Sequence, residues 1–239
     1  YDPIEIADRP ILPPSRGHPL GTDSLGRDVF SRVLHGSRTM LTVVSLSTLI
    51  SLFVGVPLGL LSGYRGGVLD RALSLVMDSI YAFPGLILAI AVAAMLGPGV
   101  YNTAISIAVV YMPTYFRMVR GEVLSLKERT FVEAARALGA RDRTILRRYL
   151  LPNVLPTILV VFSLNVADAV LTEAGLSFLG LSVPSPTPDW GFDMRNGQRY
   201  FLSGYWWLVT FPGLMIILLC VGFSLLGEGL DAILNPREA

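Results

Sequence analysis

The chain has 239 residues, of which 52% are hydrophobic and 15% are charged. A soluble domain typically carries about a quarter charged residues, so this composition argues against a soluble protein. The net charge of +1 gives no reason to expect a nucleic-acid partner, and a single cysteine, Cys220, excludes an internal disulfide.

The first part of the chain precedes any long apolar segment. Residues 1–22 carry five prolines, which favour an extended segment lying on the protein. Asp23 is predicted as a helix N-cap, because residues 24–37 then alternate apolar and charged faces at helical spacing. We therefore predict a short interfacial helix that leads into the first membrane span.

Long windows without Asp, Glu, Lys or Arg locate the membrane spans. These windows are residues 39–64, 79–116, 149–167 and 200–227. About 20 helical residues cross about 30 Å of hydrocarbon, and the "GPG" at 97–99 divides the longest window into two such lengths. Repeated windows of this length disfavour a soluble protein with buried helices. The sequence thus predicts five spans, near residues 39–62, 79–96, 102–120, 154–178 and 206–230.

Prolines and tryptophans refine the spans. Pro84 is expected to kink the second span. The proline-rich segment 182–200 is predicted as an external loop that ends in a short helix. Trp190, Trp206 and Trp207 stand where an aromatic belt would meet the membrane interface.

The basic residues set the predicted orientation. Nine of the 19 lie between residues 117 and 148, and such loops stay in the cytoplasm. We therefore expect an external segment at 1–36, followed by a transmembrane domain at 37–239 with a cytoplasmic loop at 121–152 and a cytoplasmic C-terminus. Five spans with an external start suggest a sixth span ahead of Tyr1.

The stretch "EAARALGARDRTILRRYLLP", residues 133–152, carries five arginines between apolar segments. Burying the basic residues from 127 to 148 in the bilayer would cost on the order of 15–25 kcal/mol, so the stretch stays in water. Its alanines favour a helix, Glu133 suits the first turn, and Gly139 suits the stop. A second short helix is expected after Gly139, and Pro152 either ends it or opens the next span. The first helix is too short to be stable alone, so docking in a groove on a partner would explain it, but the residues by themselves favour a plain solvated loop helix.

The same stretch resembles the cytoplasmic loop of bacterial ABC importer permeases. The family pattern is E-A-A, three residues, G, nine residues, then I-x-L-P, and this chain departs from it only by Tyr149 at the isoleucine position. The segment "HPLGTDSLGRDVFSR" at 18–32 resembles the C-type permease subunit of dipeptide, oligopeptide and nickel importers. The resemblance covers nearly the whole chain.

The resemblance implies an all-α, polytopic transmembrane helix bundle of the type I importer kind, with six spans in the family. It implies a bacterial inner-membrane heterodimer with a second permease, one or two ABC ATPase subunits and an external substrate-binding protein. ATP and Mg would be held by the ATPase subunits, and no cofactor is expected in this chain. The implied ATPase-coupling residues are Glu133, Ala134, Ala135, Ala137, Leu138, Gly139, Leu151 and Pro152.

The sequence lacks patterns typical of an enzyme. A phosphate-binding loop needs G-x-x-x-x-G-K-[ST], but the only lysine, Lys127, follows Leu126. His18 and His35 have no nearby cluster of carboxylates or cysteines, so no metal site is expected. We therefore expect a transport subunit, with ATP hydrolysis on partner chains.

Two acidic residues interrupt the fourth predicted span. Asp168 is a candidate for the translocation path or for contact with a partner helix, and Glu173 lies nearer the external end. The interpretation that we favour is that both make structural hydrogen bonds within the bundle. They are five residues apart and do not share a helix face, which argues against an intramembrane enzyme with paired carboxylates.

Several functions stay open at this point. A peptide importer is favoured, and import of nickel, glutathione or haem by the same machinery is the nearest alternative. An ion-coupled carrier or a channel would work without ATPase subunits, but it leaves the charged helix at 133–152 unexplained.

Overall fold

The computed structural model describes residues 1–234, which form ten helical segments; within that range, extended pairing is limited to one bridge between Thr22 and Asp28. The chain folds into two compact units. Unit 1 contains Tyr1–Ser47, Leu86–Ile107 and Val166–Gly222, and unit 2 contains Thr48–Gly85, Ala108–Asn165 and the chain from Phe223 onward.

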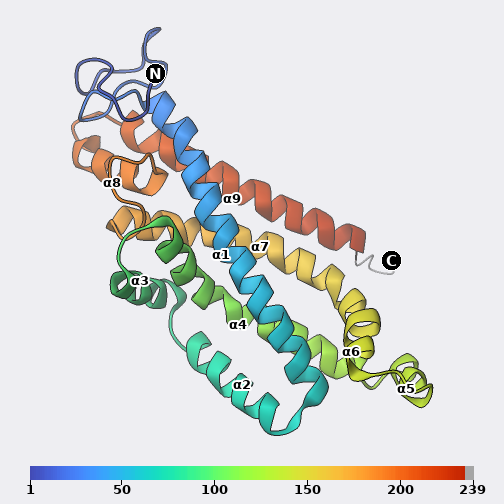
Figure 1. Ribbon diagram of the computed structural model, residues 1–239. Coiled ribbons are helices and arrows are strands. Elements are labelled where there is room, and N and C mark those ends of the chain that lie inside the picture. Colours follow the sequence, from blue (N-terminus) through green and yellow to red (C-terminus); the bar gives the residue numbers. More distant parts are fainter. Residues whose placement is uncertain (235–239) are drawn as a thin grey trace. The chain divides into compact units, whose positions relative to one another are not determined.

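Figure 1 shows the helices in chain order. They are α1 (Val29–Arg65), α2 (Gly67–Tyr81), α3 (Gly85–Leu96), α4 (Val100–Leu126), α5 (Thr130–Ala137), α6 (Asp142–Thr144), a π-helical segment (Ile145–Leu150), α7 (Leu151–Leu179), α8 (Trp190–Phe201) and α9 (Trp207–Leu234).

Three helical stretches are long and apolar enough to cross a membrane. They are α1, the continuous stretch Asp142–Leu179, and α9, and the broken pair α2 and α3 makes a fourth if it is counted as one span. The remaining predicted span corresponds to α4, which has 27 residues but is less apolar. Many residues of α4 are buried, including the polar Thr103 and Ser106. Less of the α4 surface is therefore available to face lipid, so the helix can be less apolar.

The start of α1 differs from the prediction. The expected interfacial helix after Asp23 does not form as a separate element, because α1 begins at Val29 and continues without a break to Arg65. Gly26 has a φ of +81°, in the left-handed region that a helix cannot use. Asp28 is the N-cap instead, since its Oδ2 accepts the backbone N–H of Ser31 at 2.8 Å.

The predicted interruption at Pro84 is confirmed, and it is a break rather than a kink. Helix α2 ends at Tyr81, α3 begins at Gly85, and the residues between them are not helical. Proline has no N–H for the helix ladder and restricts the residue before it, which explains the break.

Unit 1 contains two buried tryptophans, so the predicted aromatic belt is wrong for them. Trp190, at the start of α8, donates its Nε1–H to the carbonyl of Val33 at 2.8 Å, and Trp207 packs with Val29, Val33 and Leu208. Only Trp206 is exposed, at 48%. An indole ring buried with its N–H satisfied stabilises the packing of α8 on α1. The predicted short helix at the end of the external loop is confirmed as α8.

Unit 2 is built on a direct contact between the backbones of α1 and α4. Gly55, Gly59 and Gly63 follow one another at every fourth position, which places them on one face of α1. A Cβ on Gly59 would lie 2.7 Å from the carbonyl oxygen of Phe116, and one on Gly63 would lie 2.9 Å from that of Arg120. Small residues allow this approach, which maximises van der Waals contact where lipid provides no hydrophobic drive.

Candidate functional site

Helix α5 is anchored to unit 2 through one side only. Val132 and Ala135 are buried, and Val132 belongs to an apolar cluster with Ile145, Leu150 and Val154, which come from the π-helical segment and α7. The eight residues of α5 could not form a stable helix alone, so this burial fixes its position.

The end of α5 is a Schellman motif at Gly139, which confirms the predicted helix stop. Gly139 has a φ of +81°, and its N–H donates to the carbonyl of Arg136 at 2.9 Å. The N–H of Ala140 donates to the carbonyl of Ala135 at 3.0 Å. Glycine adopts this left-handed conformation without steric strain. The motif turns the chain sharply while satisfying the carbonyls at the helix end.

Of the two alternatives for Pro152, the structure confirms the second, in which the proline opens the next span. The chain from Asp142 does not stop before Pro152 but runs through the π-helical segment directly into α7. Pro152 lies in the first turn of α7 and has no N–H, so it removes a normal i→i−4 bond next to the π-helical turns. The loop after α5 is therefore continuous with a membrane span.

Three polar contacts tie the α5 region to the end of α1. The hydroxyl of Tyr64 donates to Asp142 Oδ1 at 2.7 Å, and the Arg136 guanidinium lies 5.3 Å from the centre of the Tyr64 ring. The ammonium of Lys127 donates to the carbonyl of Gly63 at 3.0 Å. A displacement of α5 is thereby passed to α1 as well as to α7.

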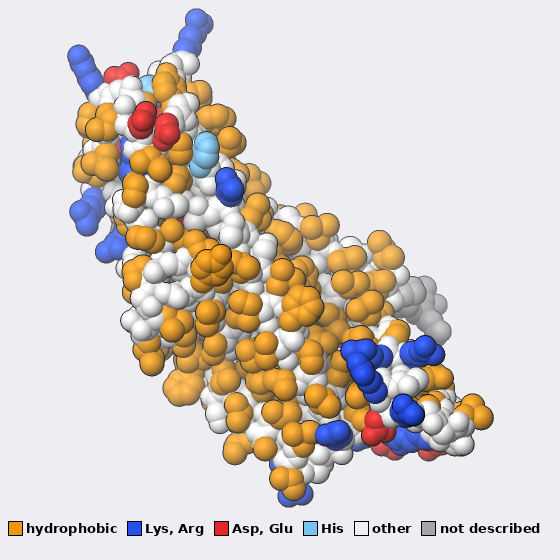
Figure 2. Space-filling view, viewed as in Figure 1, with side chains coloured by type: hydrophobic (Ala, Val, Ile, Leu, Met, Phe, Trp, Pro, Cys, Tyr) orange, Lys and Arg blue, Asp and Glu red, His pale blue; other side chains and the backbone are white. Residues whose placement is uncertain are grey.

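The outer face of α5 has no cover within unit 2. Leu138 is 89% exposed, and Glu133, Ala134, Ala137 and Gly139 are also exposed. Exposed arginines surround this end of the molecule at positions 141, 143, 147 and 148, as Figure 2 shows. The exposed face of α5 and its cap thus combines one large apolar side chain, Leu138, with small residues and neighbouring arginines.

The structure thus brings four of the eight predicted coupling residues together on α5, with Leu138 and Gly139 directly after its last residue. Ala135 differs from the others because it packs inward. Leu151 is half-buried and Pro152 is exposed, both in the first turn of α7. Their assignment to ATPase coupling stays a prediction.

Glu173 and Asp168 lie on the same helix in different surroundings. Glu173 is fully buried, and its Oε1 accepts the hydroxyl of Ser182 at 3.0 Å, so the structural interpretation is confirmed for this residue. Asp168 is exposed on α7, and within residues 1–234 its carboxylate has no hydrogen-bond partner. The structural interpretation is therefore not supported for Asp168.

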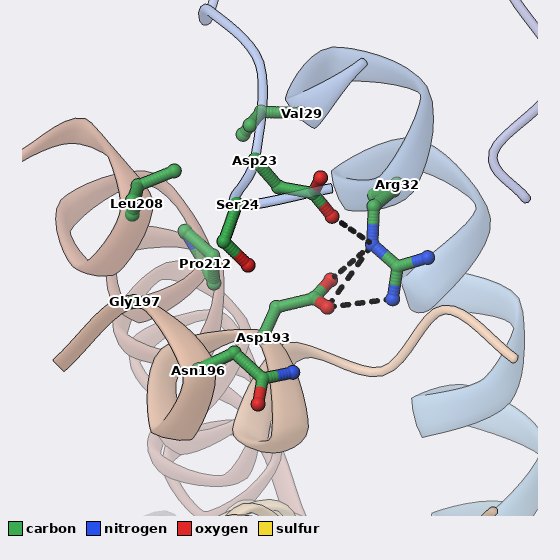
Figure 3. Close-up of a pocket in the computed structure, with 9 residues that line it drawn as sticks. All are labelled: Asp23, Ser24, Val29, Arg32, Asp193, Asn196, Gly197, Leu208 and Pro212. Atoms are coloured by element: carbon green, nitrogen blue, oxygen red, sulfur yellow. Dashed lines mark hydrogen bonds and ion pairs between the residues drawn. The ribbon is translucent and has the colours of Figure 1, made fainter. Parts of the chain in front are cut away.

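A buried ion pair in unit 1 escaped the sequence analysis (Figure 3). Arg32 of α1 donates from Nη2 to Asp193 Oδ1 at 2.6 Å, and its Nη1 donates to the carbonyl of Pro3 at 2.9 Å. Asp23 Oδ2 lies 3.9 Å from Nε. Burial raises the pKa of Asp193 to about 6, although the Arg32 charge acts in the opposite direction. The adjoining cavity of about 20 Å³ is large enough for about one water molecule, so the pair is structural.

The histidines hold no metal site in the part of the chain that the structure describes. The sequence suggested no carboxylate near His18, but the structure places Asp28 Oδ1 2.8 Å from its Nδ1. Burial would raise the pKa of Asp28, but hydrogen bonds with His18 and Ser31 outweigh it and lower the pKa below its ordinary value. This contact holds the segment before α1 on the helix that follows.

The long apolar helices define an integral membrane protein. Residues 55–239 match the family described as the binding-protein-dependent transport system inner membrane component, and the chain belongs to this family.

Similar proteins place the chain among importer permeases. It is 44% identical to the glutathione transport system permease protein GsiD of Pectobacterium atrosepticum, over 94% of this chain and 74% of that one. It is 40% identical to the probable D,D-dipeptide transport system permease protein DdpC of Escherichia coli K12, over 99% and 80%. A dipeptide permease, DppC of Alkalihalophilus pseudofirmus, is 41% identical over 94% and 73%.

A solved structure confirms the fold. An inward-facing form of the MetNI methionine ABC transporter matches with a TM-score of 0.70 at 20% identity, over 86% of this chain and 97% of that chain. The expected helix bundle of the ABC importer permease kind is therefore confirmed.

Proposed function

We propose that this chain forms half of the translocation path of an ATP-driven importer for dipeptides or oligopeptides. The names of its relatives support the peptide class, and one of them names glutathione. Import of nickel, glutathione or haem by the same machinery is the alternative that the resemblance left open.

The observation that carries the coupling role is the one-sided anchoring of α5. Its inner face is buried in unit 2, while Glu133, Ala134 and Leu138 face outward. This arrangement fits a helix that inserts into a groove on an ATPase subunit and transmits its motion to the bundle.

ATP and Mg are assigned to the partner subunits. The amine of Lys127, the only lysine, is engaged by the carbonyl of Gly63, which leaves it unsuited to a phosphate loop. The proposed partners are a second permease, one or two ABC ATPases and an external substrate-binding protein. The α5 end and the C-terminus would face the cytoplasm, and residues 1–36 the outside.

The test is uptake by the purified complex in proteoliposomes together with its ATPase rate. Glu133→Lys, or proline within residues 134–137, is expected to abolish uptake while membrane insertion stays normal. Glu128→Lys is the matched control, because Glu128 is exposed in the same loop but lies outside α5. Normal uptake by the Glu133 and proline variants would overturn the coupling role, and uptake without ATPase subunits would favour a carrier.

Asp168 is proposed to face the translocation path or the second permease. An ionisable residue in a span usually serves a pathway or a partner, and this one is exposed within the single chain. Asp168→Asn is expected to reduce uptake in an assembled complex. Wild-type uptake rates would remove it from the path.

A further inference from the structure

Two adjoining hollows lie along α8 in unit 1. The first, of about 500 Å³, is lined by Phe178, Leu179, Arg195, Gln198, Arg199 and Leu202. The second, of about 350 Å³, is lined by Gln198, Phe201, Leu202 and Val209. Because Gln198 and Leu202 line both, the hollows form one continuous surface, which we call the α8 groove.

One end of the α8 groove is cationic. Arg195 and Arg199 are four residues apart and therefore share a face of α8. Within residues 1–234 neither guanidinium has a carboxylate partner, and no acidic residue lines the groove. The Arg195 guanidinium lies against Gly180, where a Cβ would collide with it. The groove is thus charged for an anion that this chain does not supply.

The other end is apolar and exposed. Leu202 is 97% exposed, Phe201 47% and Leu179 49%. The groove lies where α7 ends, at Leu179, and where α9 begins, at Trp207, and both belong to stretches long and apolar enough to span a membrane. Apolar side chains at the end of a span are expected at the level of the lipid headgroups.

We propose that the α8 groove binds an anionic phospholipid, with its phosphate on Arg195 and Arg199 and an acyl chain along Leu202 and Val209. Arginine pairs bind phosphate oxygens through charge-assisted hydrogen bonds. A peptide substrate fits less well, because its free amine would find no carboxylate in the groove. The proposal is independent of what the complex transports.

The test measures lipid binding to the delipidated, assembled complex by native mass spectrometry. Phosphatidylglycerol is titrated, with phosphatidylcholine as the uncharged comparison and inorganic phosphate as competitor. We expect the double change Arg195→Gln and Arg199→Gln to weaken phosphatidylglycerol binding at least about tenfold. Arg9→Gln with Arg16→Gln is the matched control, because these exposed arginines belong to the segment before α1. Leu202→Asp is expected to weaken binding of the long-chain lipid without affecting assembly.

Each outcome decides the proposal. The proposal is supported if the complex prefers phosphatidylglycerol, if the Arg195 and Arg199 changes remove this preference, and if the control changes retain it. Equal binding of both lipids overturns the proposal. It is also overturned if inorganic phosphate competes fully and Leu202→Asp has no effect on lipid binding. The proposal is also overturned if the Arg195 and Arg199 changes leave lipid binding unchanged but abolish binding of the external substrate-binding protein. That result would assign the groove to a protein partner.

Discussion

The two units of this protein are stabilised by opposite means. In unit 1, a buried arginine ties together three segments that are far apart in sequence, through Asp193 and the carbonyls of Pro3 and Pro186. In unit 2, glycines without side chains bring the backbone of α1 close to the carbonyl oxygens of α4. The irregular segment before α1 has few backbone partners and needs polar side chains to hold it, whereas long helices satisfy their own backbone and can rely on close packing.

The largest effect is expected from breaking the buried pair of unit 1. Asp193→Leu leaves the Arg32 guanidinium buried without its carboxylate, which typically costs about 3–5 kcal/mol. The midpoint of thermal unfolding of the purified complex should fall accordingly. Adding Arg32→Met should restore much of the loss, because the uncompensated charge is then gone.

The matched control is an exposed pair in unit 2. Arg117 and Asp78 lie 2.9 Å apart with both side chains about half exposed, so Asp78→Leu should cost less than about 1 kcal/mol. Equal losses for Asp78→Leu and Asp193→Leu would show that burial does not distinguish the two pairs.

The next effect tests the glycine row of unit 2. Gly59→Leu places a side chain where a Cβ alone meets the Phe116 carbonyl at 2.7 Å, and we expect a loss on the order of 3 kcal/mol. Gly121→Leu on α4 is the control, because nothing lies within 4 Å of a Cβ there. Thermal unfolding and the yield of monodisperse complex would measure both. If the two variants behave alike, close packing of α1 on α4 is not what stabilises unit 2.

A smaller effect is expected from pH. The pKa of Asp193 is about 6 in the folded protein and 3.8 for an ordinary aspartate, so the folded state binds more protons between these values. Stability from this group therefore rises as pH falls from 7.5 to 5, by on the order of 1 kcal/mol. Subtracting the pH dependence of Asp193→Asn from that of the wild type isolates this contribution. A difference of zero, or of opposite sign, would contradict the assignment.

The smallest effect concerns the end of α5. Gly139→Ala places a Cβ in the left-handed conformation and should cost about 1 kcal/mol, seen as a small decrease in coupled ATPase activity or stability. Gly139→Asn should cost less, since asparagine tolerates this conformation better. An alanine variant more stable than the asparagine variant would argue against the Schellman geometry.

Local features of this molecule were predictable because their causes lie within a few residues. The stop of α5 at Gly139, the break at Pro84 and the apolar spans all follow from backbone restrictions or from hydropathy. The predicted coupling residues come from a pattern that resembles a known family, and the structure places four of the eight on α5.

Long-range features were not predictable in the same way. Arg32 and Asp193 are 161 residues apart, so no periodicity links them. The burial of Trp190 depends on the Val33 carbonyl, which is far away in sequence. The local sequence around Trp190 therefore indicates the membrane interface instead. The glycine row could have been found, because three glycines at four-residue spacing in an apolar helix indicate a close helix contact.

The backbone contact between α1 and α4 has a mechanical consequence. Side chains can change rotamer and absorb a small displacement, but carbonyl oxygens set against bare α-carbons have no such slack. A displacement that reaches the end of α1 through Tyr64 or Lys127 is therefore expected to move the neighbouring part of α4 with it.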